Sequence, residues 1–108
     1  MSVPFLNSYE RTSHFLRHGR EFGATTEEEY EQMADAFMSR ILSPILQECI
    51  RMNARDRDRV RLHFDRGNFG IAYRQTILRT YHMKSQTKIR NRGGDAALLA
   101  YECGRINA

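Results

Sequence analysis

The sequence lacks the features that would mark a membrane protein or an exported one. None of its apolar runs approaches the roughly 20 residues that a membrane-spanning helix needs. The first ten residues, MSVPFLNSYE, contain neither the basic segment nor the apolar segment of a signal peptide. We therefore expect a soluble chain that has no signal peptide and makes no contact with a membrane.

Cysteine is scarce, with Cys49 and Cys103 as its two occurrences. Two thiols cannot form a disulfide framework, and neither has a second cysteine close by, as a zinc knuckle requires. Because free cysteine usually behaves as a small hydrophobic residue, we expect two partly buried free thiols. A single bridge between them stays open as the alternative.

Motifs for metal-dependent or nucleophilic hydrolysis are also missing. His14 and His18 stand four residues apart, which places them on one face of a helix. A zinc protease needs a glutamate between such histidines, whereas this sequence has Phe15, Leu16 and Arg17, and a cationic side chain there would repel the ion. No G-x-S-x-G motif and no phosphate-binding glycine loop is present. We expect neither a metal nor a cofactor.

What the chain does have is an uneven distribution of charge. Its 108 residues, of which 41% are hydrophobic and 28% charged, are typical of one folded domain, 1–108. Residues 1–54 hold five arginines and eight acidic residues, a net charge of −3, whereas residues 55–108 hold twelve basic and five acidic residues, a net charge of +7. The basic half is where a polyanion such as RNA is expected to bind. The alternative is that these charges only keep that half soluble.

The first half of the chain predicts two helices. The segment YERTSHFLRHGREFG reads as a helix of about three turns, with Ser8 as its N-cap and Gly19 or Gly23 as its C-terminal stop. The second helix begins at Thr25 or Thr26 with three glutamates in its first turn, where carboxylates meet the positive end of the helix dipole. Its apolar residues recur at helical spacing and predict a face packed on a sheet; they are Tyr30, Met33, Ala34, Phe37, Met38 and Ile41.

Pro44 is expected to interrupt the second helix or to begin another short helix, PILQECIRM. From Arg57 onward the apolar period changes to two, which is typical of strands. Three antiparallel strands are predicted, separated by the turn sequences DRGN and RQT; the last runs from Ile77 to Met83, with Ile77, Arg79 and Tyr81 on one face.

A polar, basic segment, KSQTKIRNRGG, follows the strands and is expected to be a mobile loop. The last segment, DAALLAYECGRINA, predicts a helix with Asp95 as its N-cap. The expected fold is therefore of the α+β class, with N-terminal helices packed on an antiparallel β-meander and a C-terminal helix.

The residue types that remain suit the cleavage of RNA without a metal. One group must remove the proton of the 2′-hydroxyl, another must protonate the leaving 5′-oxygen, and cations must stabilise the charge on phosphorus. Histidine suits the proton transfers because its ordinary pKa lies near neutral pH, and the arginine fork can hold two phosphate oxygens. A histidine in a helix is nevertheless more often a surface or hydrogen-bonded residue, so residue types alone permit a ribonuclease without establishing one.

The order of the segments resembles a known family. HFLRHGREFGATTEEEYEQMADAFM followed by RDRVRLHFDRGNFGIAYRQTILRTYHM is similar to the C-terminal toxin domains of bacterial polymorphic and contact-dependent growth inhibition systems. The resemblance covers about His14 to Met83, and it implies the fold of the barnase, EndoU, colicin D and RelE group of small ribonucleases. Relatives often follow the last strand with a Lys-Pro pair, where this chain has Lys84-Ser85, which leaves the role of the preceding His82 open.

The resemblance implies a metal-independent ribonuclease that commonly acts on tRNA in competition between bacteria. Such a domain passes from a producing bacterium into the cytoplasm of a target cell. An acidic immunity protein is expected to neutralise it in the producing cell. We expect a monomer apart from that complex. The implied catalytic residues are His14, His18, Arg79, Thr80 and Tyr81. Residues expected to bind RNA or phosphate are Arg59, Arg61, His82, Lys84, Lys88 and Arg90.

Two other functions remain open from the sequence. The first alternative is a basic RNA-binding module without catalysis. The second is an immunity or structural partner protein, against which the basic character of the chain, pI ≈ 9.4, speaks.

Overall fold

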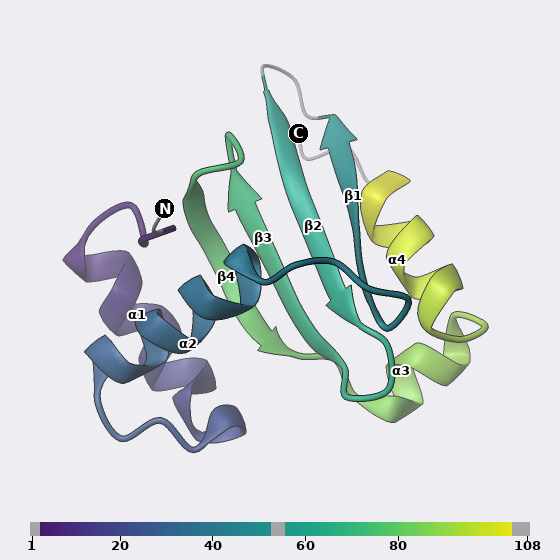
Figure 1. Cartoon of the computed structure of the whole chain (residues 1–108). Coiled ribbons are helices and arrows are strands. Elements are labelled where there is room, and N and C mark those ends of the chain that lie inside the picture. The colour runs from purple at the N-terminus through teal and green to yellow at the C-terminus, as the bar shows by residue number, and fades with distance from the viewer. Residues whose placement is uncertain (1–2, 53–55, 105–108) are drawn as a thin grey trace.

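A single antiparallel sheet organises the part of the chain that the structure, a computed structural model, describes, residues 3–52 and 56–104. Four strands lie in the order β1-β2-β3-β4, and helices pack against the sheet (Figure 1). This α+β arrangement of N-terminal helices, β-meander and C-terminal helix confirms the predicted fold class. In chain order the elements are α1 (Ser8–His18), the 3₁₀ helix η1 (Gly19–Phe22), α2 (Glu27–Ser39), β1 (Leu46–Met52), β2 (Arg57–His63), β3 (Asn68–Tyr73), β4 (Ile77–Met83), α3 (Gln86–Asn91) and α4 (Asp95–Gly104).

Side chains at the N-termini define where the first two helices begin. The side chain of Asn7 accepts a hydrogen bond of 2.9 Å from the backbone N–H of Glu10, so Asn7 and not the predicted Ser8 caps α1. Thr26 caps α2 in the same way through the N–H of Glu29, as predicted.

The buried stripe of α2 packs against β3 and β4. Phe37 and Met38 lie over Gly70, where an added Cβ atom would come within 2.6 Å of the Met38 sulfur. Glycine at this position therefore lets helix and sheet approach closely. Ile41, predicted as part of the stripe, lies beyond the end of the helix at Ser39 and is 89% exposed.

Two apolar clusters fill the space between sheet and helices. One joins α2 and the N-terminal segment to the sheet; its buried members are Val3, Phe5, Tyr30, Ala34, Phe37, Met38, Leu46, Ala72, Leu78 and Tyr81. The other joins the sheet to α3 and α4; its buried members are Val60, Leu62, Phe69, Ile71, Ile89, Leu98 and Leu99. Because α4 packs on β1 and β2, the far edge of the sheet, at β4, is left for other contacts.

The segment after Pro44 forms strand β1, so the predicted short helix is wrong. β1 pairs with β2 along its whole length, from Leu46 opposite His63 to Met52 opposite Arg57. Two of the cross-strand pairs carry opposite charges, Glu48 with Arg61 and Arg51 with Asp58, and the second forms a buried ion pair of 3.1 Å. Such cross-strand pairs stabilise neighbouring strands, and they cannot be recognised from the residue pattern of the segment alone.

The segment predicted as a mobile loop contains the helix α3. The side chain of Ser85 accepts a hydrogen bond of 3.1 Å from the N–H of Lys88 and so caps the helix. Ile89 is buried in the second apolar cluster, and this one anchor orders an otherwise polar segment.

A disulfide joins Cys49 of β1 to Cys103 of α4, with 6.2 Å between the two Cα atoms. The expectation of two free thiols is therefore wrong, and the single bridge left open as the alternative is what the structure contains. The bond ties the C-terminal helix to the edge strand, 54 residues away in sequence.

Candidate active site

The end of α1 meets the outer edge of β4, and this junction gathers the histidines of the first helix and of the last strand. His18 is the last residue of α1, and the chain then tightens into η1. An added Cβ atom on Gly19 would lie 2.7 Å from the ring of Phe15, so glycine permits this tight continuation. η1 ends at Gly23, which has the left-handed φ of 71° that favours glycine.

Glu21 of η1 links the two elements. One of its carboxylate oxygens, Oε1, accepts a hydrogen bond of 2.7 Å from the backbone N–H of Met83 in β4. The other, Oε2, lies 2.7 Å from Nδ1 of His18. A carboxylate at Nδ1 fixes the orientation of a histidine ring and leaves Nε2 as the nitrogen that can exchange a proton with a substrate.

His82 of β4 lies against His18, with 5.0 Å between the centroids of the two rings. Its Nδ1 atom is 3.0 Å from the hydroxyl oxygen of Thr80. Burial, together with the charges of Lys84 and His18, lowers the pKa of His82 to about 4. The ring is therefore neutral at pH 7.

His14 is the third histidine of the junction and the most deeply placed in α1. Its ring centroid lies 6.2 Å from that of His18 and 5.1 Å from that of Phe5, on which it stacks. Its Nε2 atom is 3.6 Å from a carboxylate oxygen of Glu10. Burial, and next the charge of Arg17, lower the pKa of His14 below its usual value.

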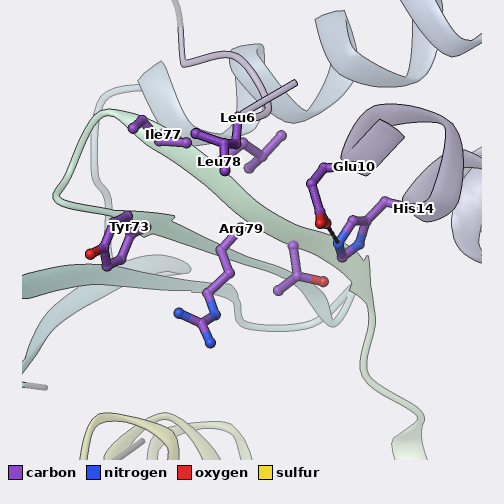
Figure 2. Close-up of a pocket in the computed structure, with 8 residues that line it drawn as sticks. Leu6, Glu10, His14, Tyr73, Ile77, Leu78 and Arg79 are labelled. Atoms are coloured by element: carbon purple, nitrogen blue, oxygen red, sulfur yellow. Dashed lines mark ion pairs between the residues drawn. The ribbon is translucent and has the colours of Figure 1, made fainter. Parts of the chain in front are cut away.

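A cleft of about 460 Å³ opens beside this junction, between α1, the N-terminal segment and the β3–β4 edge. Figure 2 shows Glu10 and His14 pointing toward one another on one side of it. Arg79 extends from β4 away from that pair, and its exposed side chain has no ion pair within the described part of the chain. The lining residues are Leu6, Glu10, His14, Tyr73, Ile77, Leu78, Arg79 and Thr80.

The structure thus brings together five of the residues predicted from sequence. His14, Arg79 and Thr80 line the cleft, while His18 and His82 adjoin it through His14 and Thr80. Three histidines from two distant segments and an exposed arginine therefore share one edge of the sheet.

Tyr81 lies elsewhere, because a β-bulge interrupts β4. Ile71 pairs with Thr80 and Ala72 with Leu78, so Arg79 is an extra residue and the predicted alternation of faces is wrong from there on. Tyr81 consequently turns into the core, where it is 4% exposed. Its ring stacks on Phe22 with 4.0 Å between centroids, so it does not reach the cleft.

Arg59 and Arg61 also lie away from the cleft, and their guanidinium groups already bind partners within the fold. Both form ion pairs with Glu48 of β1, at 2.9 and 3.2 Å. They also donate to the last carbonyls of α2: Arg61 to those of Phe37 and Arg40, and Arg59 to that of Met38. These arginines cap the C-terminus of α2. Neither arginine can join Arg79 from the neighbouring strand, since β3 and not β2 adjoins β4.

The three remaining cations predicted to bind RNA differ in environment. Lys84 forms an ion pair of 2.7 Å with Glu102 of α4, and both side chains are largely buried. Its ammonium group also lies 4.4 Å from the ring centroid of Phe69. Lys88 and Arg90 of α3 are exposed to solvent and free to meet a polyanion.

Three residues of the site were missed in the sequence. Glu10 stands four residues before His14 and Glu21 three residues after His18, and both spacings place a carboxylate on the histidine face of a helix. That signal was present in the sequence. Tyr73 reaches the cleft through the β3–β4 pairing, which no local pattern reveals.

Comparison of the chain with protein-family models, with characterised proteins and with solved structures finds no match. Within residues 3–52 and 56–104 no helix is long and apolar enough to cross a membrane. The same residues hold no cluster of three or more histidine, cysteine and carboxylate side chains suited to a metal ion.

Proposed function

We propose that the chain is a metal-independent ribonuclease that cleaves RNA, of the tRNA class, through attack by a 2′-hydroxyl. One observation carries the proposal: the His18–Glu21 pair stands beside the neutral ring of His82, 5.0 Å away between centroids, at the edge of a cleft that contains Arg79. Two imidazoles this close together can both contact one phosphodiester.

The environments of the two histidines suggest how they divide the proton transfers. Neutral His82 accepts the proton of the 2′-hydroxyl, whose oxygen then forms a bond to phosphorus. The bond from phosphorus to the 5′-oxygen breaks, and His18 donates its Nε2 proton to that oxygen. Glu21, at Nδ1 of His18, stabilises the protonated form of the ring from which this proton is donated. The products are a 2′,3′-cyclic phosphate and a free 5′-hydroxyl.

Arg79 supplies the cation for this reaction. Its exposed guanidinium reaches solvent from β4, the strand that carries Thr80 and His82. An arginine fork can hold two non-bridging oxygens of the pentacoordinate phosphate as their negative charge grows. Thr80 orients the ring of His82 through its hydroxyl group.

The basic half of the sequence and the resemblance to toxin domains support the biological side of the proposal. As a toxin, the domain would be delivered from a producing bacterium into the cytoplasm of a target cell. An acidic immunity protein would block it in the producer.

The test is incubation of the protein with total tRNA in the presence of EDTA. The wild type should give discrete fragments that end in 2′,3′-cyclic phosphate, and His18→Ala should give none. Leu16→Ala is a matched control, because Leu16 lies on the same helix, is 76% exposed and does not line the cleft. A substrate with 2′-deoxyribose should stay intact. Tight binding of tRNA without fragments would instead support the non-catalytic RNA-binding module.

A further inference from the structure

A second pocket, of about 290 Å³, lies on the side of β4 that faces α2. It is bounded by the last turn of α2, by η1, and by the turn between β2 and β3, which Figure 1 shows at the lower end of the sheet. The residues on which the argument depends are Phe22, Arg40, His63, Arg66, Asn68 and Tyr81.

The rim of this pocket is cationic. Arg40 and Arg66 are exposed, and neither forms an ion pair within residues 3–52 and 56–104. Of the described residues that line the pocket none is acidic. Arginines elsewhere in the fold, such as Arg59 and Arg61, are matched by Glu48. Two unmatched guanidinium groups around one concavity favour an anion between them.

The floor of the pocket adds neutral hydrogen-bonding groups. The hydroxyl of Tyr81 accepts a hydrogen bond of 3.1 Å from the side-chain amide of Asn68, and its own proton remains to be donated. Arg40 lines the same pocket as Tyr81. Burial raises the pKa of Tyr81, and the hydrogen bond from Asn68 and the charge of Arg40 act against that shift. His63, buried at the end of β2, accepts the N–H of Arg66 at Nδ1, which leaves Nε2 as a donor.

The pocket and the candidate active site adjoin each other at two points in the chain. Tyr81 lies between Thr80 and His82 on β4, and Phe22 directly follows Glu21 in η1. Residues next to each other in the chain therefore belong to the two different sites, both on β4 and in η1. A flexible polyanion held at one side can continue around the end of β4 to the other.

We propose that this second pocket binds a phosphate group of the RNA strand whose scissile phosphate lies in the cleft. Arg40 and Arg66 hold the phosphate oxygens, and Tyr81 and His63 donate to them from the floor. The identity of the strand rests on the proposed ribonuclease function, whereas the binding of a phosphate group rests on the pocket itself.

The experiment uses the wild-type chain and a 2′-O-methyl pentanucleotide, which has no free 2′-hydroxyl and so cannot be cleaved. Binding is followed by ¹H–¹⁵N NMR, together with a separate titration of inorganic phosphate. Both probes should shift the backbone amides of Arg66 and Asn68 and the side-chain amide of Asn68. Arg40→Gln and Arg66→Gln should each weaken pentanucleotide binding by about tenfold, and each should reduce its salt slope by about one.

Arg57→Gln is the matched control, because Arg57 is also exposed and stands at the opposite end of β2 from His63. Shifts spread evenly over the basic surface, or an equal loss in all three variants, would overturn the proposal. Cleavage of tRNA by the wild type is measured in parallel. If tRNA is cleaved but no NMR shifts occur in the pocket, the phosphate site is contradicted and the ribonuclease proposal stands. If phosphate binds in the pocket but tRNA is not cleaved, the phosphate site stands and the ribonuclease proposal is contradicted.

Discussion

His82 shows how one buried side chain links the candidate site to the stability of the fold. Its ordinary pKa of 6.5 falls to about 4 in the folded chain. Between these two values the unfolded chain binds a proton that the folded chain does not. The contribution of His82 is therefore fully present above pH 6.5 and is lost as the pH falls toward 4.

Replacement of His82 by glutamine should remove this part of the pH dependence. The free energy of unfolding of the wild type should fall between pH 7 and pH 4.5 by about 2 kcal/mol more than that of the variant. Urea unfolding at the two pH values measures the difference. All other titratable groups are present in both proteins, so their contributions cancel in the difference. Parallel curves for the two proteins would show that His82 is as well solvated as in the unfolded chain.

Arg79→Lys tests the role of the guanidinium fork. Lysine keeps the charge but cannot hold two phosphate oxygens in one plane, so kcat for tRNA cleavage should fall by at least about tenfold. The melting temperature should stay within about 2 °C, since Arg79 is exposed and surface substitutions rarely change stability by more than about 0.5 kcal/mol. Arg57→Lys, at an exposed arginine of β2 that does not line the cleft, is the control and should keep its rate. An unchanged rate in Arg79→Lys would remove the fork from the mechanism.

The sequence predicted most members of the candidate site, because the i, i+4 spacing of His14 and His18 is a local property of a helix. It misplaced Tyr81, because the side on which a strand residue lies depends on the register of its pairing. The bulge opposite Ile71 and Ala72 shifts every later residue of β4 by one position. The sequence between Ile77 and Met83 contains no mark of that shift.

The same contrast between local and long-range causes holds for the helices and strands. α2 was predicted with its N-cap, since three glutamates after Thr26 act within one turn. β1 was missed, because the pairing that stabilises it, including the ion pair between Arg51 and Asp58, forms only with β2. α3 was missed, because Ile89 is the apolar residue that anchors it and a single apolar residue cannot show a helical period.

Because a disulfide joins β1 to α4, we expect the stability of the fold to depend on redox conditions. Cys49 and Cys103 close a long loop, so reduction should lower the free energy of unfolding by about 2–4 kcal/mol. Denaturant unfolding with and without dithiothreitol measures this difference. The Cys49→Ser/Cys103→Ser variant is the control and should not respond to the reductant. Two titratable thiols in the unreduced wild type would show that the bond does not form.

At the scale of the whole molecule, the excess of positive charge in the second half is only partly available to a ligand. Arg59 and Arg61 cap α2 and pair with Glu48, and Lys84 pairs with Glu102. These groups hold helices to the sheet. The exposed cations Arg79, Lys88 and Arg90, together with those of the second pocket, remain for a polyanion.

If the domain is a toxin, its production should harm the cell that makes it. Induction of the wild-type chain in a bacterial host should stop growth within a few generations and leave fragmented tRNA in the cell. His18→Ala leaves every arginine and lysine in place, and once its fold has been verified by circular dichroism it should be tolerated. Healthy growth at a high level of the wild-type protein would favour the RNA-binding module.

The proposed acidic immunity protein would act through the same exposed charge, and a simple acidic polymer can imitate that part of its action. Polyglutamate should inhibit tRNA cleavage at low ionic strength, because it occupies the cationic surface beside the cleft. Inhibition should weaken steeply between about 50 and 200 mM salt, because the release of cations condensed on the polymer then contributes less free energy to binding. Polyethylene glycol of similar length, which carries no charge, is the control for the crowding effect of a polymer on the protein. Inhibition that is independent of salt would show that the blocking surface is not electrostatic, and an immunity protein would then have to recognise the apolar edge of the cleft, at Leu6 and Ile77.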